Sequence, residues 1–317
     1  WQKTSAGNEH TLAIKQDGTL WAWGKGGDGR LGLSNSTSYS SPKQVGALTD
    51  WDTPIATNES SLCLKTDGTL WTWGKNGDGE LGLGDTSDRN SPVQVGALTT
   101  WTQAGSTAQG SGAIKTDGTL WVWGYNNYGQ LGVGNTTNYS SPVQVGALTD
   151  WSNVQGGAYS MYAVKTDGTL WAWGRNASGR LGDGSTTDRS SPVQIGALTS
   201  WAKVGGGGSA AHAIKTDGTL WGWGDGGYGQ LGVGNTTAYS SPVQVGALTD
   251  WSLLNRGAEH VDAIKTDGTF WNWGYYLALG QGAATINLSS PTQLGALTTW
   301  GAVPIGNLSN NSVSLKN

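Results

Sequence analysis

The sequence predicts an all-β propeller of four-stranded antiparallel blades, and three observations predict it. A unit of fifty residues recurs six times with almost no insertion or deletion, which is the signature of a repeat architecture. Each unit contains short apolar segments separated by turn residues, as strands do, and no segment has the periodicity of a helix. Stacked repeats share one core, so we expect a single domain over residues 1–317. The units occupy residues 1–50, 51–100, 101–150, 151–200, 201–250 and 251–299, and a partial copy occupies 300–317.

Each unit is expected to form four strands joined by short connections. Asp167 and Gly168 lie between the second and third strands of the fourth unit, and this residue pair favours a type I′ hairpin turn. Pro192 is expected to open the fourth strand, because a residue without an N–H donor costs least at a sheet edge. We therefore place the fourth strand at the outer rim and the first strand near the axis. In the fourth unit the expected strands span residues 151–155, 161–166, 169–173 and 192–195.

The tryptophans are expected to pack each blade against the next. All 19 of them occupy three positions of the repeat. Side chains alternate along a strand, so Trp171 and Trp173 point to one side of the sheet while Leu170 and Ala172 point to the other. A sheet that is apolar on both sides and has no helices to cover it is most simply a blade between like blades. The paired tryptophans assigned to this packing are Trp21, Trp23, Trp71, Trp73, Trp121, Trp123, Trp171, Trp173, Trp221, Trp223, Trp271 and Trp273.

Variation between the units is confined to one face of the expected ring. Successive strands alternate in direction, so the connections from first to second strand and from third to fourth strand emerge together, on what we call the varied face. The Asp-Gly turns and the Gly-Ala-Leu-Thr links emerge on the opposite, constant face and differ little between units. Loops on a rigid scaffold commonly carry binding sites, and tyrosine gives contact area at low entropic cost. The candidate binding residues, which would suit a protein or a glycan, are Tyr39, Tyr125, Tyr128, Tyr139, Tyr159, Tyr228, Tyr239, Tyr275 and Tyr276.

Composition argues against several other functions. The net charge is -4 and basic residues do not cluster, so we expect no nucleic-acid partner. No apolar run reaches the length of a membrane span, so we expect no membrane insertion. His10, His212 and His260 lie in loops of different units, where a structural hydrogen bond is a commoner role than metal binding or proton transfer. We therefore expect no catalytic residue, no metal site, no cofactor and no enzymatic activity.

The repeat resembles that of a known family. The run from Ala113 to Gly132 combines Asp-Gly-Thr-Leu-Trp, Trp-Gly and Gly-Gln-Leu-Gly, and it closely resembles the repeat of the regulator of chromosome condensation family. The resemblance covers essentially the whole chain and implies a seven-bladed propeller whose last blade is incomplete here. Such a blade is either completed by strands outside this stretch or left short. A ring of six blades, with the partial copy overlapping, is the alternative.

Known tasks of that family can be compared with these residues. Members that exchange nucleotide on a small nuclear GTPase use irregular insertions as a wedge, whereas five units here keep one length. The plant ultraviolet photoreceptor has tryptophans in a Gly-Trp-Arg-His-Thr context that this sequence lacks. A secreted bacterial inhibitor of β-lactamase is similar in fold and grips its partner with one propeller face. This resemblance implies a protein-binding regulator or inhibitor, either intracellular or secreted.

The amino-acid sequence of the linkers resembles that of a different group of proteins, and the role implied by this resemblance is our leading expectation. Segments 140–151 and 240–251 share Ser-Ser-Pro-Val-Gln-Val-Gly-Ala-Leu-Thr-Asp-Trp, and they are similar to the near-identical repeat propellers encoded by aquatic bacteriophages and some bacteria. The resemblance implies a virion surface or tail-fibre component whose varied face engages a receptor, a glycan or a neighbouring structural protein. The expected location is a virion or the cell exterior, with the cytoplasm as the alternative. The absence of an initiator Met leads us to expect a larger polypeptide.

Overall fold

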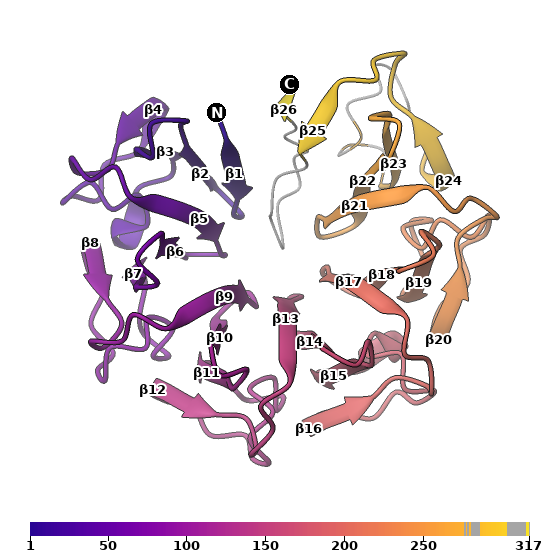
Figure 1. Cartoon of the computed structure of the whole chain (residues 1–317), viewed down its shortest axis with the longest axis horizontal. Coiled ribbons are helices and arrows are strands. Elements are labelled where there is room, and N and C mark those ends of the chain that lie inside the picture. Colours follow the sequence, from indigo (N-terminus) through magenta and orange to yellow (C-terminus); the bar gives the residue numbers. More distant parts are fainter. Residues whose placement is uncertain (276, 278, 280–285, 303–314, 317) are drawn as a thin grey trace.

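The structure is a computed structural model that describes residues 1–275, 277, 279, 286–302 and 315–316. Its sheets stand around a central axis as the blades of a propeller (Figure 1). Within the described residues, six sheets have four antiparallel strands each, so the all-β propeller fold is confirmed with six complete blades. No helix in this part of the chain has the length and apolar character needed to cross a membrane.

The first three blades have closely similar boundaries. Blade 1 contains β1 (Lys3–Ala6), β2 (His10–Ile14), β3 (Leu20–Gly24), the 3-10 turn η1 (Gly27–Gly29) and β4 (Tyr39–Gln44). Blade 2 contains β5 (Trp51–Ala56), β6 (Ser60–Lys65), β7 (Leu70–Gly74) and β8 (Arg89–Gln94). Blade 3 contains β9 (Trp101–Ser106), β10 (Gly110–Lys115), β11 (Leu120–Gly124) and β12 (Tyr139–Gln144).

The later blades repeat this pattern. Blade 4 contains β13 (Trp151–Gly156), β14 (Ser160–Lys165), β15 (Leu170–Gly174), the 3-10 turn η2 (Ala177–Gly179) and β16 (Arg189–Gln194). Blade 5 contains β17 (Trp201–Gly206), β18 (Ala210–Lys215), β19 (Leu220–Gly224) and β20 (Tyr239–Gln244). Blade 6 contains β21 (Trp251–Arg256), β22 (His260–Lys265), β23 (Phe270–Gly274) and β24 (Leu288–Gln293), and a two-stranded sheet of β25 (Trp300–Ala302) and β26 (Leu315–Lys316) follows.

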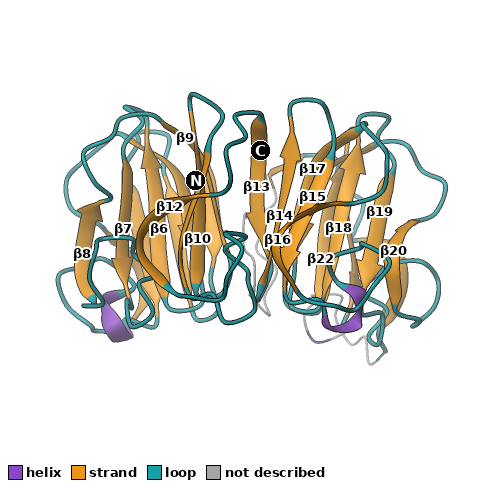
Figure 2. Cartoon of the chain, turned by 90° about the horizontal axis from the view of Figure 1, so that it is seen from below, coloured by secondary structure: helices purple, strands orange, loops and turns teal. Residues whose placement is uncertain are grey.

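Strand order runs outward from the axis in every complete blade. The first strand of each unit is innermost and the fourth is outermost (Figure 1), as expected from the sequence. Seen from the side, both 3-10 turns lie on the same face of the ring, where the connections from third to fourth strand emerge (Figure 2). The connections from third to fourth strand therefore share one face of the ring.

The hairpin turn between second and third strands differs from the type I′ turn that the sequence predicts. In blade 4 the Gly168 N–H donates to Lys165 O at 3.0 Å and the Lys165 N–H donates to Thr169 O at 3.0 Å. Gly168 has a φ of +77°, whereas Asp167 lies outside the left-handed region. The loop is thus a three-residue hairpin with glycine in the left-handed position. Asp167 instead accepts hydrogen bonds from the Thr169 N–H at 2.9 Å and hydroxyl at 2.7 Å.

The outer strand also begins earlier than expected. Pro192 is the fourth residue of β16, which starts at Arg189, so the prediction that proline opens this strand is wrong. The register shifts between Ala172 and Gly174 of β15, where three residues of β16 lie opposite one residue. Pro192 falls within this bulge on an edge strand, where the missing donor breaks no regular pairing.

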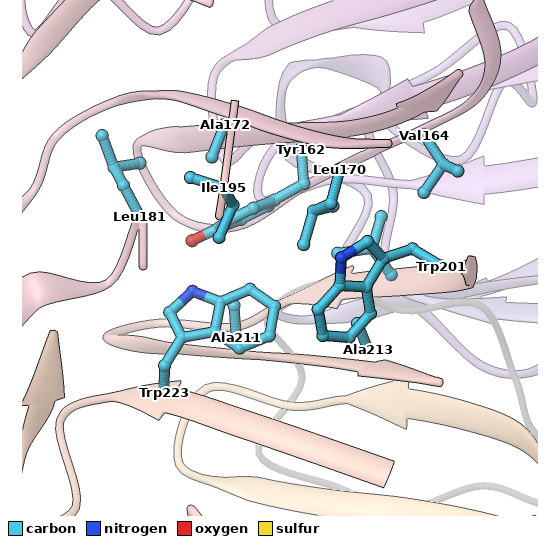
Figure 3. Packing of buried hydrophobic residues seen from close by; sticks show 11 residues of the cluster. Tyr162, Val164, Leu170, Ala172, Leu181, Ile195, Trp201, Ala211, Ala213 and Trp223 are labelled. Carbon is cyan, nitrogen blue, oxygen red and sulfur yellow. The ribbon is translucent and has the colours of Figure 1, made fainter. Parts of the chain in front are cut away.

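Packing between blades depends on the second tryptophan of each pair. Trp223 of blade 5 shares one buried cluster with Tyr162, Leu170 and Ala172 of blade 4 (Figure 3), its ring centroid lies 6.4 Å from that of Tyr162, and its side chain is fully buried. Its Nε1–H donates to the Arg180 backbone oxygen in blade 4 at 2.9 Å. The same bond is made by Trp73 to Arg30 O, Trp123 to Glu80 O, Trp173 to Gln130 O and Trp273 to Gln230 O at 2.9–3.1 Å. Blades 2 to 6 are therefore each attached to the preceding blade by an indole hydrogen bond as well as by apolar contact.

One glycine makes this close approach possible. Gly182 lies against the Trp223 indole with a φ of +84°, and a Cβ there would come within 2.7 Å of Nε1. The second glycine of the Gly-x-Leu-Gly element is thus required for two reasons: the backbone has a positive φ there, and a side chain would collide with the indole.

The first tryptophan of each pair is less buried. Trp171 is half-buried, and its Nε1–H donates to the Thr169 hydroxyl at 2.9 Å. Thr169 in turn donates to Asp167, so the turn, the strand and the indole form one chain of hydrogen bonds. The Thr169 hydrogen bonds lower the pKa of the Asp167 carboxyl.

The tryptophan side of blade 1 is less covered than that of the other blades. Trp23 is half-buried, whereas Trp73 is fully buried. Trp1 is 45% exposed, whereas Trp51 is 4% exposed. Only β25 and β26 lie between blade 6 and blade 1 in the described part of the chain (Figure 1). Blade 1 therefore faces two strands where each other blade faces four.

Candidate binding face

The loops of the varied face are held together by backbone hydrogen bonds. In blade 4 the Arg175 N–H donates to Tyr159 O at 2.9 Å, which joins the loop at 157–159 to the loop at 175–188. On the constant face the Trp151 N–H donates to Gly118 O at 3.2 Å, which joins the link to the hairpin turn. The connections therefore divide between two faces as the strand order requires.

A buried asparagine shapes the long loop that carries Tyr125 and Tyr128. Asn126 donates through Nδ2 to Asn135 O at 3.0 Å and to Thr137 O at 2.9 Å. Its Oδ1 accepts the Leu131 N–H at 2.9 Å. A side chain that satisfies several backbone groups in this way fixes the loop without regular secondary structure.

Three of the candidate tyrosines form one cluster across two blades. Tyr125 and Tyr128 belong to blade 3, and Tyr159 belongs to blade 4. The Tyr128 and Tyr159 ring centroids are 5.2 Å apart, and Tyr125 lies 6.3 Å from Tyr128 and 6.2 Å from Tyr159. The Arg175 guanidinium lies 4.9 Å from the Tyr128 ring and 5.7 Å from the Tyr159 ring. We call these four residues the tyrosine cluster, and all four are half-buried.

A second aromatic pair lies between blades 5 and 6. Tyr228 is 39% exposed, and its ring centroid lies 5.1 Å from that of Tyr275. Burial raises the pKa of the neighbouring Glu259, and repulsion from Asp225 adds to the effect. Tyr276 lies outside the described residues.

The remaining candidate tyrosines occupy a different place. Tyr39, Tyr139 and Tyr239 are the first residues of outer strands, and all are half-buried. The Tyr139 hydroxyl accepts a hydrogen bond from Asn135 at 3.0 Å, and the Tyr239 hydroxyl accepts one from Asn235 at 3.2 Å. These residues belong to the rim and do not join the tyrosine cluster.

Sequence reasoning missed an ionic sector on the varied face of blades 1 and 2. The guanidinium of Arg30 is almost fully buried, 3.0 Å from Asp28, 3.5 Å from Glu9 and 3.6 Å from Glu59. Lys25 pairs with Glu9 at 2.7 Å, and its hydrogen bond is the main cause that lowers the pKa of Glu9. The partners come from different loops and blades, so no local sequence pattern could have indicated them. The varied face is thus ionic over blades 1 and 2 and aromatic over blades 3 and 4.

The three histidines are buried in second strands, so the expectation that they lie in loops is wrong: His10 and His260 begin β2 and β22, and His212 lies within β18. His10 Nε2 lies 2.9 Å from Ser61 Oγ in the next blade, and His212 Nε2 lies 3.1 Å from Leu231 O. Burial, with repulsion from Arg30, lowers the pKa of His10 to about 3. Among the residues that the structure describes, no group of three His, Cys, Asp or Glu side chains could hold a metal ion.

Comparison with known proteins identifies the repeat. The regulator of chromosome condensation (RCC1) repeat matches residues 17–55, 67–114, 117–164, 167–214 and 217–264, and a second form of the same repeat matches residues 1–30. The chain is 36% identical over 50 residues to the serine/threonine-protein kinase Nek8 of Danio rerio, a match that covers 16% of this chain and 7% of the kinase.

Solved structures share the fold at low sequence identity. Human WBSCR16 superposes with a TM-score of 0.86 at 21% identity, covering 100% of this chain and 86% of that chain. Prp20p of Saccharomyces cerevisiae superposes with a TM-score of 0.82 at 20% identity, covering 99% of this chain and 82% of that chain. The latter structure is described together with its binding to Gsp1p and histones. At these identities the likeness concerns the fold.

Proposed function

Because this chain belongs to the regulator of chromosome condensation (RCC1) repeat family, we propose that it is a non-enzymatic protein-binding module. The observation that carries the proposal is the tyrosine cluster of the varied face. Tyr128, Tyr159 and Arg175 come from loops of two neighbouring blades and lie in contact. Tyrosine and arginine are enriched among the residues that dominate protein interfaces.

The arrangement of the cluster supports a binding role over a purely structural one. The buried clusters on the two sides of blade 4 are formed by inter-blade tryptophans and mainly aliphatic residues, and they include none of these four side chains. The three rings and the guanidinium remain half-buried at the surface. Mutual packing restrains their rotamers, which lowers the entropy lost when a partner binds.

The relatives also favour a protein partner. Yeast Prp20p, which shares this fold, is described by its binding to Gsp1p and to histones. We propose the same kind of ligand here, a protein surface, without its identity. The regulator or inhibitor role expected from the family therefore ranks above the virion role. The virion setting, a glycan or receptor ligand, and a location on a virion or outside the cell stay predictions that depend on the linker wording alone.

The experiment is a binding comparison with a matched control. A partner is first selected with the wild-type chain from a displayed protein library, and a glycan array is probed in parallel. The double variant Tyr128→Ala/Tyr159→Ala should weaken binding by at least about 30-fold, because hot-spot truncations cost about 2 kcal/mol or more. The control Tyr139→Ala/Tyr239→Ala removes two rim tyrosines and should leave affinity unchanged. Undiminished binding by the first variant, or binding confined to glycans, would refute the proposal.

We also propose that the ring has seven blade positions. The support is the place of β25 and β26 between blades 6 and 1, together with the partial exposure of Trp1 and Trp23. A full blade at the seventh position would present an apolar side to these two indoles, as blade 1 does to Trp73.

A further inference from the structure

Equivalent grooves open where one blade's outer strand meets the next blade. The first groove, of about 530 Å³, lies between blades 2 and 3 and includes Val93, Leu98, Trp121 and Pro142. The second groove, of about 430 Å³, lies between blades 3 and 4 and has the corresponding residues fifty positions later, Val143, Leu148, Trp171 and Pro192. Both volumes fall within the range of small-ligand sites.

A lysine distinguishes the first groove from the second. Lys115 lines the first groove, with Nζ 3.8 Å from the Trp121 ring centroid. In the described part of the chain, no carboxylate oxygen lies within ion-pair distance of this ammonium group. At three equivalent positions, Lys65 pairs with Asp50 at 3.3 Å, Lys165 with Asp150 at 3.4 Å and Lys265 with Asp250 at 3.5 Å. Lys215, which has Ser200 at the corresponding position, shares the unpaired state among the described residues but lines neither groove.

The sequence explains this difference. Thr100 stands where these three units have aspartate, so the repeat has lost the counter-ion of Lys115. Asp117, in the hairpin turn close to Lys115 in the sequence, does not distinguish the two grooves, because every unit has an aspartate at that position. Arg89 also lines the first groove, but its guanidinium already pairs with Asp85 at 2.6 Å. Lys115 is thus a cation beside an apolar wall with room for an anion.

The backbone beside the groove offers a further feature. Val93 and Gln94 belong to the end of β8, an edge strand that pairs with β7 and receives one further backbone hydrogen bond, from the Ser34 N–H to Asn90 O at its other end. Edge strands have free N–H and C=O groups that can pair with an extended peptide. The groove therefore combines an apolar wall, an unpaired ammonium group and strand edge.

We propose that the first groove binds the C-terminus of a peptide that ends in an apolar side chain. The terminal carboxylate pairs with Lys115, and the last side chain packs on Trp121 and Val93. A chain end carries its carboxylate and its side chain on the same Cα, which matches an ammonium group 3.8 Å from an indole ring. This site contains no residue of the tyrosine cluster, so it does not depend on the function proposed above.

The test uses the whole chain and a short defined peptide. Isothermal titration with N-acetyl-Val-Leu at millimolar concentration should give saturable binding. The corresponding C-terminal amide should bind at least about tenfold more weakly, because it lacks the charged partner of Lys115. 4-Methylpentanoate, which keeps the carboxylate and the apolar body without peptide groups, should also bind more weakly.

Both variants place at position 100 a residue that other units have at the equivalent position. Thr100→Asp supplies the counter-ion found in three units and should weaken peptide binding at least about tenfold, while Thr100→Ser, the residue at position 200, should not. Circular dichroism of both variants checks that the ring is intact. Equal binding of acid and amide, unchanged binding by Thr100→Asp, or no binding at millimolar peptide would overturn the proposal. Equal affinity for 4-methylpentanoate would overturn the assignment of a peptide.

Discussion

His10 should make the stability of the ring depend on pH in a calculable way. Its side chain is 3% exposed, its Nε2 faces Ser61, and the neighbouring Arg30 guanidinium is itself buried. The folded-state pKa falls to about 3 from an ordinary value of 6.5. Between those values the unfolded chain binds a proton at His10 that the folded chain does not. The free energy of unfolding therefore decreases as the pH falls below 6.5 and is unaffected by His10 above about pH 7.5.

The magnitude follows from the unfolded-state pKa, provided the folded value stays well below the working pH. A pH of 5 is about 1.5 units below the pKa of the histidine in the unfolded chain. Protonation of the unfolded chain therefore lowers the free energy of unfolding by about 2 kcal/mol relative to pH 8. The perturbation is His10→Ser, since serine occupies the equivalent positions 60 and 160. This variant loses packing at every pH, but it should lose the pH dependence that His10 contributes.

The assay is urea denaturation followed by tryptophan fluorescence at pH 8 and pH 5, after reversibility has been checked. The fall in unfolding free energy between the two pH values should be about 2 kcal/mol larger in the wild type than in His10→Ser. NMR gives an independent measurement, because the His10 ring resonances should not titrate between pH 8 and pH 5. An equal pH dependence in both proteins, or a titration of His10 near pH 6.5, would refute the claim that His10 is buried and neutral in the folded protein.

Two further predictions concern the ring itself. Trp123→Phe keeps most of the apolar contact but leaves the Glu80 carbonyl without its indole donor, so it should lower the free energy of unfolding, measured by urea denaturation, by about 1–3 kcal/mol. Trp121→Phe, at the half-buried position, should lower it less. The reverse order would contradict the role given to the inter-blade hydrogen bond. A crystal structure should show successive blades rotated by about 51° rather than about 60°, as expected when a full turn is divided among seven positions rather than six, and the larger angle would exclude the seventh position.

The repeat carried most of the information about the fold. The recurrence of Trp173 at one position of the unit predicts contact between blades, because a strand with apolar side chains on both faces needs a neighbouring sheet on each face. The hairpin was placed correctly but its type was wrong, since Asp167 is engaged with Thr169 and only Gly168 takes the left-handed conformation. The start of β16 was missed because a bulge lets three residues lie opposite one, which no alternation pattern reveals.

The candidate face was less accessible from the sequence. Tyr128 and Tyr159 lie 31 positions apart, and they meet only because loops of adjacent blades lean together over the junction. The same is true of Arg30 and Glu59 in the ionic sector. Contacts of this kind depend on loop conformations that buried side chains such as Asn126 impose. A sequence shows which loops share a face but not which side chains touch.

The repetition of the indole hydrogen bond affects how the blades come to stand in the correct order around the ring. Every junction from blade 1 to blade 6 uses the same donor, the same kind of acceptor and nearly the same apolar surface, so the interfaces themselves do not distinguish a correct neighbour from a distant one. Short links such as residues 95–100, which connect β8 to β9, supply that information by limiting how far each blade can reach. Covalent continuity, rather than surface recognition, therefore enforces the sequence of the ring, and two units could be exchanged with little change at the seams.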